Sequence, residues 1–520
     1  MCNSHMKRAF IVILLCALAA MNQTSAAAQQ IPFLSELFSR YDQFNRLYNE
    51  KRRAGASLAA VEALRKRGED SFRRGNIPAI IEVVSEATAL LQGKQWNERQ
   101  KFLASLTVET DRLVVEPNQE LQVSLTRIYP ADLEKAFPAA ATVSFEVVPS
   151  SKATGDAAAA QVSPRPVVIA QKLAIAEASS NAARRMLLAE GAYWVIARIE
   201  TGGQVVAELK QPVYAITDFS DSIRSLNKMV DDIKRSNDPK IAAVASLVTT
   251  PEFRLQRLSL LNKTRGEDEV DPIQELSNIE ASLSALAKGQ NPFAKERGEL
   301  ERAYQGSDGK LIPYRVYVPQ SYDETSSRPL VVLLHGAYGD ERYYFSGLFD
   351  PAAIKAEADR RGYILAGVNG RGRLNGYRGL AVEDTYEVIK AIEHDYKIDA
   401  SRVYLAGHSM GGYGVWLVAA EKPEVFAAIA SVSGGAPAQG EALSALLQKL
   451  KAIPALVAYG AKDGLVPPER SREMAAAAQK AGLKVTNLEM PEADHLTIVA
   501  ATFPALLDFF EKNARPAPAK

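Results

Sequence analysis

A glycine-flanked serine stands in the stretch Val403–Gly412, whose sequence is VYLAGHSMGG. The apolar residues before Gly407 predict a buried strand, and the pattern after Gly411 predicts a helix that ends near Glu421. A Gly-x-Ser-x-Gly sequence between a strand and a helix is typical of a nucleophile elbow, a tight turn that presents one serine at its tip. Glycines are expected there because a Cβ atom would crowd the turn. The pattern predicts Ser409 as a nucleophile; the alternative is a glycine-rich turn with an ordinary surface serine.

A serine hydroxyl needs a base, and that base needs an orienting acid, before it can attack at neutral pH. Behind such an elbow these groups follow in the order serine, acid, histidine. His495 is the single histidine after Ser409 in the chain. It is therefore the predicted base, and a surface histidine on a loop is the alternative. Asp463, in the turn YGAKDGLVP, is the predicted acid. Asp494 is its competitor, but a residue beside the base usually points elsewhere.

Nucleophilic attack on a carbonyl group also needs backbone N–H donors for the negative oxygen that forms. Met410, directly after the serine, is expected to supply one donor. Ala337, in the sequence LLHGAYG at the end of another apolar run, is expected to supply the second. His335 and His408 are expected to pack or to hydrogen-bond around the site rather than to act as bases.

A loop with the sequence NGRGRLNGYR follows the apolar run Tyr363–Val368 and is expected at the mouth of a substrate pocket. Its arginines are expected to bind a carboxylate or a sugar, and its tyrosine to stack on an aromatic acyl group. Solvated loop arginines are the alternative. The candidates for substrate contact are Tyr338, Tyr343, Tyr344, Arg371, Arg373, Tyr377 and Arg378.

Alternating strands and helices must position these groups. The expected strands are Arg302–Tyr304 paired with Tyr314–Pro319, then Leu330–His335, Tyr363–Val368, Val403–Ala406, Ala427–Val432, Ala455–Tyr459 and Val485–Met490. The expected helices are Pro351–Arg361, Val382–Tyr396, Gly411–Glu421, Glu441–Leu450, Pro468–Ala481 and Leu496–Glu511. This alternation predicts an α/β fold, a mostly parallel sheet with helices on both faces. Active sites of such sheets form at the carboxyl ends of the strands, where all three predicted catalytic residues fall.

These motifs give the C-terminal part of the chain a family resemblance. Residues from about 300 to 515 resemble an α/β-hydrolase in Leu334–Gly336, Asp399–Gly412, Gly460-x-x-Asp463 and Asp494–His495. They are most similar to secreted esterases of the feruloyl-esterase and polyhydroxyalkanoate-depolymerase type, and to the hydrolase domain of prolyl-oligopeptidase-like serine peptidases. The resemblance implies a serine carboxylester hydrolase that works through an acyl-enzyme, with a serine peptidase as the alternative. Neither a cofactor nor a metal ion is expected.

The start of the chain predicts export. Residues 1–28 have the pattern of a signal peptide, because Lys7 and Arg8 precede the apolar run Ala9–Met21 and Ala26–Ala28 offers a cleavage site. A periplasmic or secreted protein is therefore expected, and no later stretch has the length and apolar character of a membrane span. The net charge of +1 favours neither a nucleic acid nor an anionic membrane as partner.

The chain of 520 residues is too long for one core, so several domains are expected. The expected parts are helices in 29–106, an immunoglobulin-like β-sandwich in 107–217, a helical connector in 218–290, a linker in 291–298, the catalytic domain in 299–515 and a disordered tail in 516–520. Trp194 is expected in the sandwich core rather than as a ligand platform. A third functional class is a protein that binds a carbohydrate or protein partner through the β-domain, with an accessory hydrolase domain.

Overall fold

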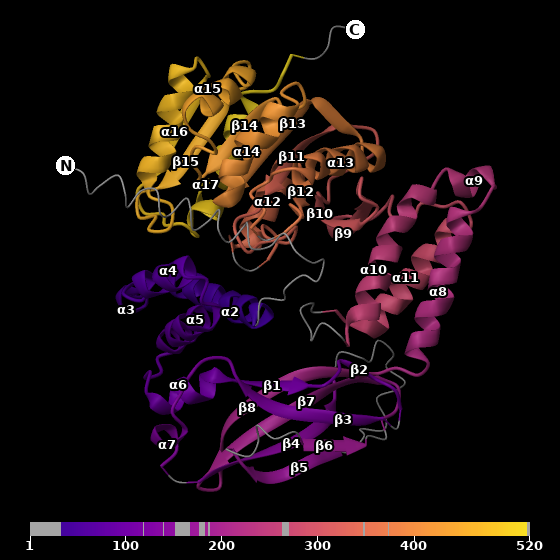
Figure 1. Ribbon diagram of the computed structural model, residues 1–520, viewed down its shortest axis with the longest axis vertical. Helices are drawn as coiled ribbons and strands as arrows, with labels where there is room; N and C mark the ends of the chain where they lie inside the picture. Colours follow the sequence, from indigo (N-terminus) through magenta and orange to yellow (C-terminus); the bar gives the residue numbers. More distant parts are fainter. Residues whose placement is uncertain are drawn as a thin grey trace. The chain divides into compact units, whose positions relative to one another are not determined.

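The computed structural model describes residues 33–117, 119–138, 140–150, 167–175, 182–185, 188–262, 270–346, 349–372 and 374–516. The expected signal peptide, Arg373 and residues 517–520 of the expected tail lie outside the described residues. The described residues form two compact units, one within Pro32–Lys295 and one within Glu296–Lys520 (Figure 1).

The C-terminal unit is built on one eight-stranded sheet with the order β16-β15-β14-β13-β11-β12-β10-β9. Strands β11 to β16 pair in parallel, whereas β10 pairs antiparallel with both β9 and β12. The strands are β9 (Gly298–Gln305), β10 (Leu311–Val318), β11 (Arg328–Leu334), β12 (Ile364–Val368), β13 (Ile398–His408), β14 (Ala428–Val432), β15 (Ala455–Gly460) and β16 (Val485–Met490). Strand β13, which carries the serine turn, therefore lies near the middle of the sheet.

Helices cover both faces of this sheet. Side chains of a strand alternate between its two faces, and β11 shows the result: Val332 lies in the same core as Trp416, whereas Val331 lies in the core that contains Phe510. The first core contains residues of α13, α14, α15 and α16, and the second contains residues of α12 and α17. The helices are α12 (Pro351–Arg361), α13 (Leu380–Asp395), α14 (Met410–Glu421), α15 (Gly440–Lys449), α16 (Pro468–Lys480) and α17 (Ile498–Glu511). The expected α/β fold is confirmed.

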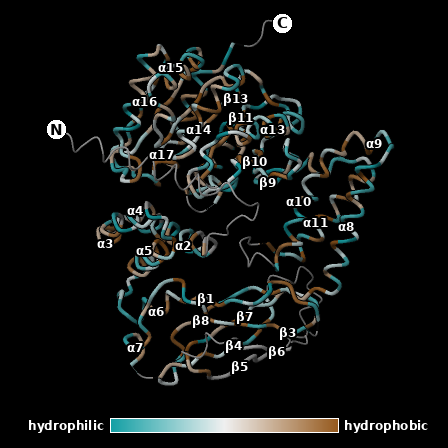
Figure 2. Tube along the Cα trace, in the orientation of Figure 1, coloured by the Kyte–Doolittle hydropathy of each residue, from teal (hydrophilic) through white to brown (hydrophobic). Residues whose placement is uncertain are grey.

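The hydropathy of the sequence explains why these strands are central. All residues of β12, β14 and β15 are buried, as are those of β11 after its first residue. Figure 2 shows the hydrophobic colour gathered along the inner strands of this unit, near β11 and β13. In contrast, the edge strand β16 has no buried residue. The sequence-based expectation of near-continuous apolar strands therefore applies to the inner strands but not to this edge.

The N-terminal unit begins with helices and continues into two sheets (Figure 1). The helices are α2 (Leu34–Arg53), α3 (Ala59–Glu62), α4 (Arg65–Arg73), α5 (Ile77–Leu91) and α6 (Glu98–Ser105), with α7 (Leu133–Ala136) in a later connection. Helix α5 starts where Asn76 caps the N–H of Ala79 and Pro78 occupies the first turn. The strands are β1 (Leu106–Thr110), β2 (Val114–Val115), β3 (Glu120–Arg127), β4 (Ala141–Pro149), β5 (Val167–Ala174), β6 (Ala182–Arg185), β7 (Gly191–Thr201) and β8 (Gln204–Ala215).

The two sheets have the orders β1-β3-β6 and β2-β8-β7-β4-β5. They share one apolar core, which contains Val123 of β3, Phe145 of β4 and Val195 of β7. This is the arrangement of a β-sandwich. The expected core position of Trp194 is wrong. Its neighbours Tyr193 and Val195 are buried in the core. Trp194 is only partly buried, and its side chain lies on the opposite face of β7.

The helices after the sandwich form a small bundle with its own core. They are α8 (Phe219–Lys234), α9 (Pro239–Ala242), α10 (Thr249–Leu260) and α11 (Pro272–Leu286). The side chain of Asn262 bonds the N–H groups of Leu113 and Val114 and the carbonyl of Val114, so this bundle is fastened to β2. Phe293, in the expected linker, is buried in the core of the bundle. Within the described residues, no helix combines the length and apolar content needed to cross a bilayer.

Candidate active site

The turn between β13 and α14 holds Ser409 in an unusual backbone conformation. Its φ is 55° and its ψ is −117°, a region that costs energy for any residue with a Cβ. The turn is locked because the Ser409 N–H donates to the carbonyl of Val432 at 2.9 Å. A Cβ atom at Gly407 would overlap the carbonyl of Gly411, and one at Gly411 would overlap the carbonyl of Leu334. Both glycines of the motif are therefore required by close backbone contact.

Three side chains predicted from the sequence lie in one hydrogen-bonded chain. His495 Nε2 lies 2.9 Å from Ser409 Oγ, and His495 Nδ1 lies 2.8 Å from Asp463 Oδ2. The other oxygen of Asp463 accepts from the N–H groups of Leu465 at 2.9 Å and Val466 at 2.8 Å. The residues come from the turns after β13, β15 and β16, and all three are buried. This arrangement can move a proton from the hydroxyl to the imidazole and hold the imidazolium beside a carboxylate.

The competing carboxylate, Asp494, has a different task. Its Oδ1 accepts from the N–H groups of Leu496 and Thr497 and from the Thr497 hydroxyl, at 3.1, 2.9 and 2.8 Å. It therefore closes the turn that leads into α17. The geometry places Asp463, and not Asp494, at the histidine ring.

The two expected backbone donors belong to the helix that starts after the serine and to the turn after β11. Met410 is the first residue of α14, so its N–H has no acceptor within the helix. Ala337 follows Gly336, and a Cβ at Gly336 would lie 3.3 Å from the Cβ of Ser409. The turn after β11 therefore approaches the serine closely at the residue before Ala337. The helix N-terminus also favours negative charge at this point.

His335 and His408 are buried, as expected for residues around the site. The two ring nitrogens of His335 each lie 2.8 Å from a carbonyl oxygen, those of Gly336 and Asn369. His335 therefore fastens the turn after β11 to the loop after β12.

Among the described residues, no group of three or more His, Cys, Asp or Glu side chains is arranged to hold a metal ion.

The expected substrate contact of Tyr377 is contradicted by the structure. Its side chain is fully buried, and its hydroxyl accepts from the N–H of His335 at 2.6 Å. A Cβ at Gly414 of α14 would lie 2.6 Å from the ring, so the tyrosine packs against that helix. The error has a physical reason: Tyr377 has a φ of 56°, and this backbone turn directs the ring inward. Sequence spacing does not reveal such a reversal.

Arg371 also differs from its expected role of binding a substrate carboxylate or sugar. Its guanidinium donates to Asp384 and, at 2.6 Å, to Asp308. These carboxylates raise the pKa of the arginine further above its ordinary value. Both donor edges of the group are thus committed to the protein. The expectation that Arg371 holds a substrate carboxylate is therefore corrected.

The remaining candidates differ in their surroundings. Arg378 is exposed and donates to the carbonyl of Pro437 at 3.3 Å. Tyr338 is partly buried, has a φ of 64° and follows Ala337 directly, so its place in the lining of the site stays a prediction.

Tyr343 and Tyr344 are buried: the Tyr343 hydroxyl lies 2.8 Å from His408 Nδ1, and the Tyr344 hydroxyl donates to the Leu334 carbonyl at 3.1 Å. These two buried tyrosines contact residues that surround the site and do not line it.

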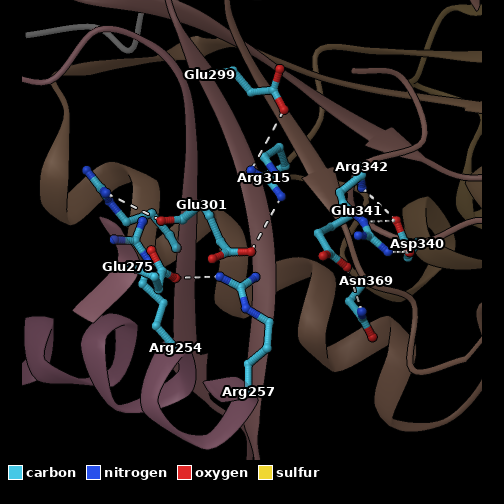
Figure 3. Close-up of polar contacts among 11 residues, drawn as sticks. Arg254, Arg257, Glu275, Glu299, Glu301, Arg315, Asp340, Glu341, Arg342 and Asn369 are labelled. Carbon is cyan, nitrogen blue, oxygen red and sulfur yellow. Dashed lines mark hydrogen bonds and ion pairs between the residues drawn. The ribbon is translucent and has the colours of Figure 1, made fainter. Parts of the chain in front are cut away.

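The segment after β11 contains a buried acid that the sequence pattern does not predict. Glu341 follows Asp340 and is buried, and its Oε2 accepts from the side chain of Asn369 at 2.8 Å. Figure 3 shows Glu341 directed toward Asn369, whereas its neighbour Arg342 pairs with Asp340. Burial, with a smaller effect of the Asp340 charge, raises the pKa of Glu341 to about 7. In the sequence DER, this glutamate looks like any surface residue.

The sheet order, the serine turn and the hydrogen-bonded Ser–His–Asp set give the C-terminal unit the architecture of the α/β-hydrolase fold. Comparison with known proteins agrees with this class. Residues 384–484 match the model of the Esterase family. Over 148 residues the chain is 33% identical to feruloyl esterase B of Neurospora crassa. This alignment covers 26% of this chain and 47% of that protein. Over 134 residues it is 28% identical to a bifunctional acetylxylan esterase/xylanase of Neocallimastix patriciarum, covering 25% of this chain and 19% of that protein.

Solved structures are also similar to part of the chain. A ferulic acid esterase aligns over 41% of this chain and 98% of that chain, with 19% identity and a TM-score of 0.35. An S-formylglutathione hydrolase from Agrobacterium tumefaciens aligns over 42% of this chain and 95% of that chain, with 17% identity and a TM-score of 0.35. The chain spans about half the length of the feruloyl esterase that it matches in sequence. The expected resemblance to serine esterases is confirmed for the C-terminal unit.

Proposed function

We propose that this protein is an exported serine hydrolase that cleaves carboxylic esters through an acyl-enzyme. The observation that carries the proposal is the unbroken hydrogen-bonded chain from Ser409 through His495 to Asp463. Its members come from three separate turns at the carboxyl edge of the sheet. A serine, an imidazole and a carboxylate aligned in this way have the geometry that nucleophilic acyl transfer requires.

In the proposed reaction, Ser409 Oγ attacks the ester carbonyl carbon while His495 Nε2 takes the hydroxyl proton. Asp463 holds the Nδ1–H of the ring and stabilises the imidazolium. The C–O bond of the ester then breaks, and the imidazolium gives its proton to the departing alcohol. Water, deprotonated by His495, attacks the acyl-serine, and the acid leaves as Ser409 regains its proton.

The N–H groups of Met410 and Ala337 are the proposed donors to the negatively charged oxygen. Donors fixed in place before the reaction stabilise this oxygen without any reorganisation, which is commonly a large part of catalysis. The helix N-terminus at Met410 and the close approach of Gly336 to Ser409 support this assignment. Tyr338 remains the proposed substrate contact nearest to these donors.

Esters are favoured over peptides because the two sequence relatives described above are esterases, one a feruloyl esterase and the other a bifunctional acetylxylan esterase/xylanase. A serine peptidase that uses the same residues is the second candidate. Turnover of feruloyl, acetyl and p-nitrophenyl esters should be measured beside peptide amides on the same enzyme sample. Ester cleavage is expected, and cleavage of amides alone would contradict the proposal. Labelling of Ser409 by a fluorophosphonate, followed by peptide mass spectrometry, identifies the nucleophile.

A contact between the N-terminal unit and a polysaccharide or protein is proposed in addition. Its support is Trp194, an aromatic side chain that is only partly buried on the face of β7 opposite the shared core. Such a ring offers a flat apolar surface for a sugar or an apolar side chain. The full-length protein and its Trp194→Ala variant should be compared in sedimentation with insoluble polysaccharides. Equal sedimentation of both would remove Trp194 from the proposal.

Export is proposed from the pattern of residues 1–28, with Lys7 and Arg8 before the apolar run Ala9–Met21. The mature protein should be recovered outside the cytoplasm of a bacterial host with its N-terminus near Gln29. N-terminal sequencing of the fractionated protein tests this. A cytoplasmic protein with an intact N-terminus would contradict the proposal.

A further inference from the structure

The histidine directly before the serine contacts the loop that carries the other histidine. His408 is fully buried at the end of β13, and its Nε2 lies 2.7 Å from the backbone carbonyl oxygen of His495. Its Nδ1 lies 2.8 Å from the hydroxyl of Tyr343. The two imidazole rings have centroids 4.6 Å apart. One side chain on a central strand therefore reaches both the turn after β11 and the loop before α17.

The partners of His408 fix where its proton lies. A carbonyl oxygen can only accept a hydrogen bond, so Nε2 must carry the hydrogen, and Nδ1 of a neutral ring then accepts from the Tyr343 hydroxyl. Burial, and secondarily the charge of His495, lower the pKa of His408 well below its ordinary value. A neutral ring with one donor and one acceptor matches its two partners. His408 is therefore not a second proton acceptor for Ser409.

The loop that carries His495 leaves the sheet at its edge, where the Lys462 N–H ties it to the turn after β15 by donating to the Ala493 carbonyl at 3.0 Å. It connects β16, which has no buried residue, to α17. Within this loop, the side chain of Asp494 organises only the turn itself. The His408–carbonyl bond instead joins the loop to β13, the strand on which Ser409 is mounted.

Tyr343 links the same anchor to the opposite side of the site. A Cβ at Gly336 would overlap the Tyr343 hydroxyl and would lie 3.3 Å from the Cβ of Ser409. The phenol therefore packs directly beneath the residue that precedes Ala337. Its ring also stacks over His408, with centroids 6.0 Å apart and an interplanar angle of 26°.

We propose that Tyr343 and His408 form a positioning pair that holds the main chain of His495 in register with Ser409. This inference rests on the proposed function, because it assigns His408 a part in keeping His495 Nε2 and Nδ1 aligned with the serine and with Asp463. His408 and Tyr343 touch no reacting atom in this scheme. They act through the backbone of the base and through the turn beneath the second N–H donor.

The test compares three variants with the wild type. His408→Leu removes the donor to the carbonyl, His408→Gln returns an amide N–H near the position of Nε2, and Tyr343→Phe removes the hydroxyl that donates to Nδ1. Displacement of a reacting group by about 1 Å costs on the order of 10²-fold in rate. We expect His408→Leu to lower kcat for p-nitrophenyl acetate about 100-fold with KM within about threefold. His408→Gln should recover at least about tenfold of that loss, and Tyr343→Phe should lower kcat about five- to tenfold.

A second readout does not depend on substrate. The proton between His495 Nδ1 and Asp463 should give a low-field resonance in the ¹H NMR spectrum of the wild type and of Ser409→Ala. We expect it to shift upfield or broaden in His408→Leu and to return in His408→Gln. His394→Leu, at an exposed histidine of α13, is the matched control and should change neither readout.

The outcomes separate the two proposals. A wild-type protein that cleaves no ester would refute the proposed function, whereas the NMR comparison would still test the positioning pair. Wild-type kcat together with an unchanged resonance in His408→Leu would overturn the inference. If His408→Leu does not fold, His408→Gln and Tyr343→Phe decide: a kcat equal to wild type and an unmoved resonance in Tyr343→Phe would overturn it as well.

Discussion

Two loops at the same edge of the catalytic sheet use the same strained backbone for opposite purposes. In the loop after β13, Ser409 has a φ of 55° and presents its Oγ to His495. In the loop after β12, Arg371 and Tyr377 have φ values of 54° and 56°. Their side chains instead turn into the protein, the arginine to Asp384 and the tyrosine to the backbone of His335. We call the loop after β13 the reactive loop, because it presents the Ser409 hydroxyl, and the loop after β12 the bracing loop, because its side chains contact the protein around the site.

The difference shows what a strand end does and does not determine. Position at the carboxyl edge brings a loop to the active region, and a positive φ redirects its side chains. Neither feature decides whether a side chain meets solvent or the interior. In the second loop the side chains have partners within the protein: the buried N–H of His335 for the phenol, and the buried Asp384 and exposed Asp308 for the guanidinium. The contrast between the reactive loop and the bracing loop can be tested by substitution in each.

The largest effect is expected at the tip of the reactive loop. Ser409→Ala removes the proposed nucleophile and should lower kcat/KM for p-nitrophenyl esters by at least about 10⁴-fold. The melting temperature should stay within a few degrees of wild type, because the hydroxyl is small and the turn is held by backbone contacts. Ester turnover and circular dichroism measure the two quantities. A fully active variant would place the nucleophile elsewhere.

The next largest effect is expected at Asp463, and Asp494, the other carboxylate near His495, serves as its matched control. Asp463→Asn leaves the shape intact but disturbs the ring tautomer, so kcat should fall about 10³- to 10⁴-fold. Asp494→Ala removes a turn-closing acceptor and should cost about 1 kcal/mol of stability while kcat changes less than about tenfold. Steady-state kinetics and chemical denaturation of both variants are the measurements. The reverse ranking of the two kcat values would make Asp494 the orienting acid.

In the bracing loop, a loss of stability should exceed the loss of substrate affinity. Tyr377→Phe leaves the buried N–H of His335 without its acceptor, which should cost about 1–3 kcal/mol of unfolding free energy. We expect KM for feruloyl and acetyl esters to change in parallel, by less than about threefold. A rise in KM restricted to the feruloyl ester would restore Tyr377 as an aromatic contact. Urea denaturation and kinetics with both esters separate the two results.

The smallest effect concerns Glu341, which bonds the first residue of the bracing loop. Its folded pKa of about 7 lies above the ordinary value of 4.5. Between these two pH values the folded carboxyl binds more proton than the unfolded one, so its contribution to stability falls as pH rises from about 4.5 to 7. The total should be at most about 3 kcal/mol. Glu341→Gln should remove this decline, seen as a flatter profile of melting temperature against pH than in wild type.

Much of the catalytic unit could be predicted because its signals are local. The helices Pro351–Arg361 and Pro468–Lys480 were expected almost to the residue, since proline at each start and apolar spacing mark them. Ser409, Asp463 and His495 were predicted from motif and chain order, and the structure brings these three together. Tyr377 was misplaced because an inward turn depends on partners distant in sequence. Glu341 was missed because burial by other elements leaves no mark on a short charged stretch.

The position of β16 has a consequence for how the enzyme fails under stress. Ser409 follows a strand in the middle of the sheet, whereas His495 follows the edge strand Val485–Met490, whose residues are all partly or fully exposed. Edge segments with few buried contacts open at lower free energy than the core, without global unfolding. Amide hydrogens of β16 should therefore exchange with deuterium before those of β13. On gradual heating, His495 would detach from a serine turn that is still native, so the proposed esterase activity would be lost before the protein melts.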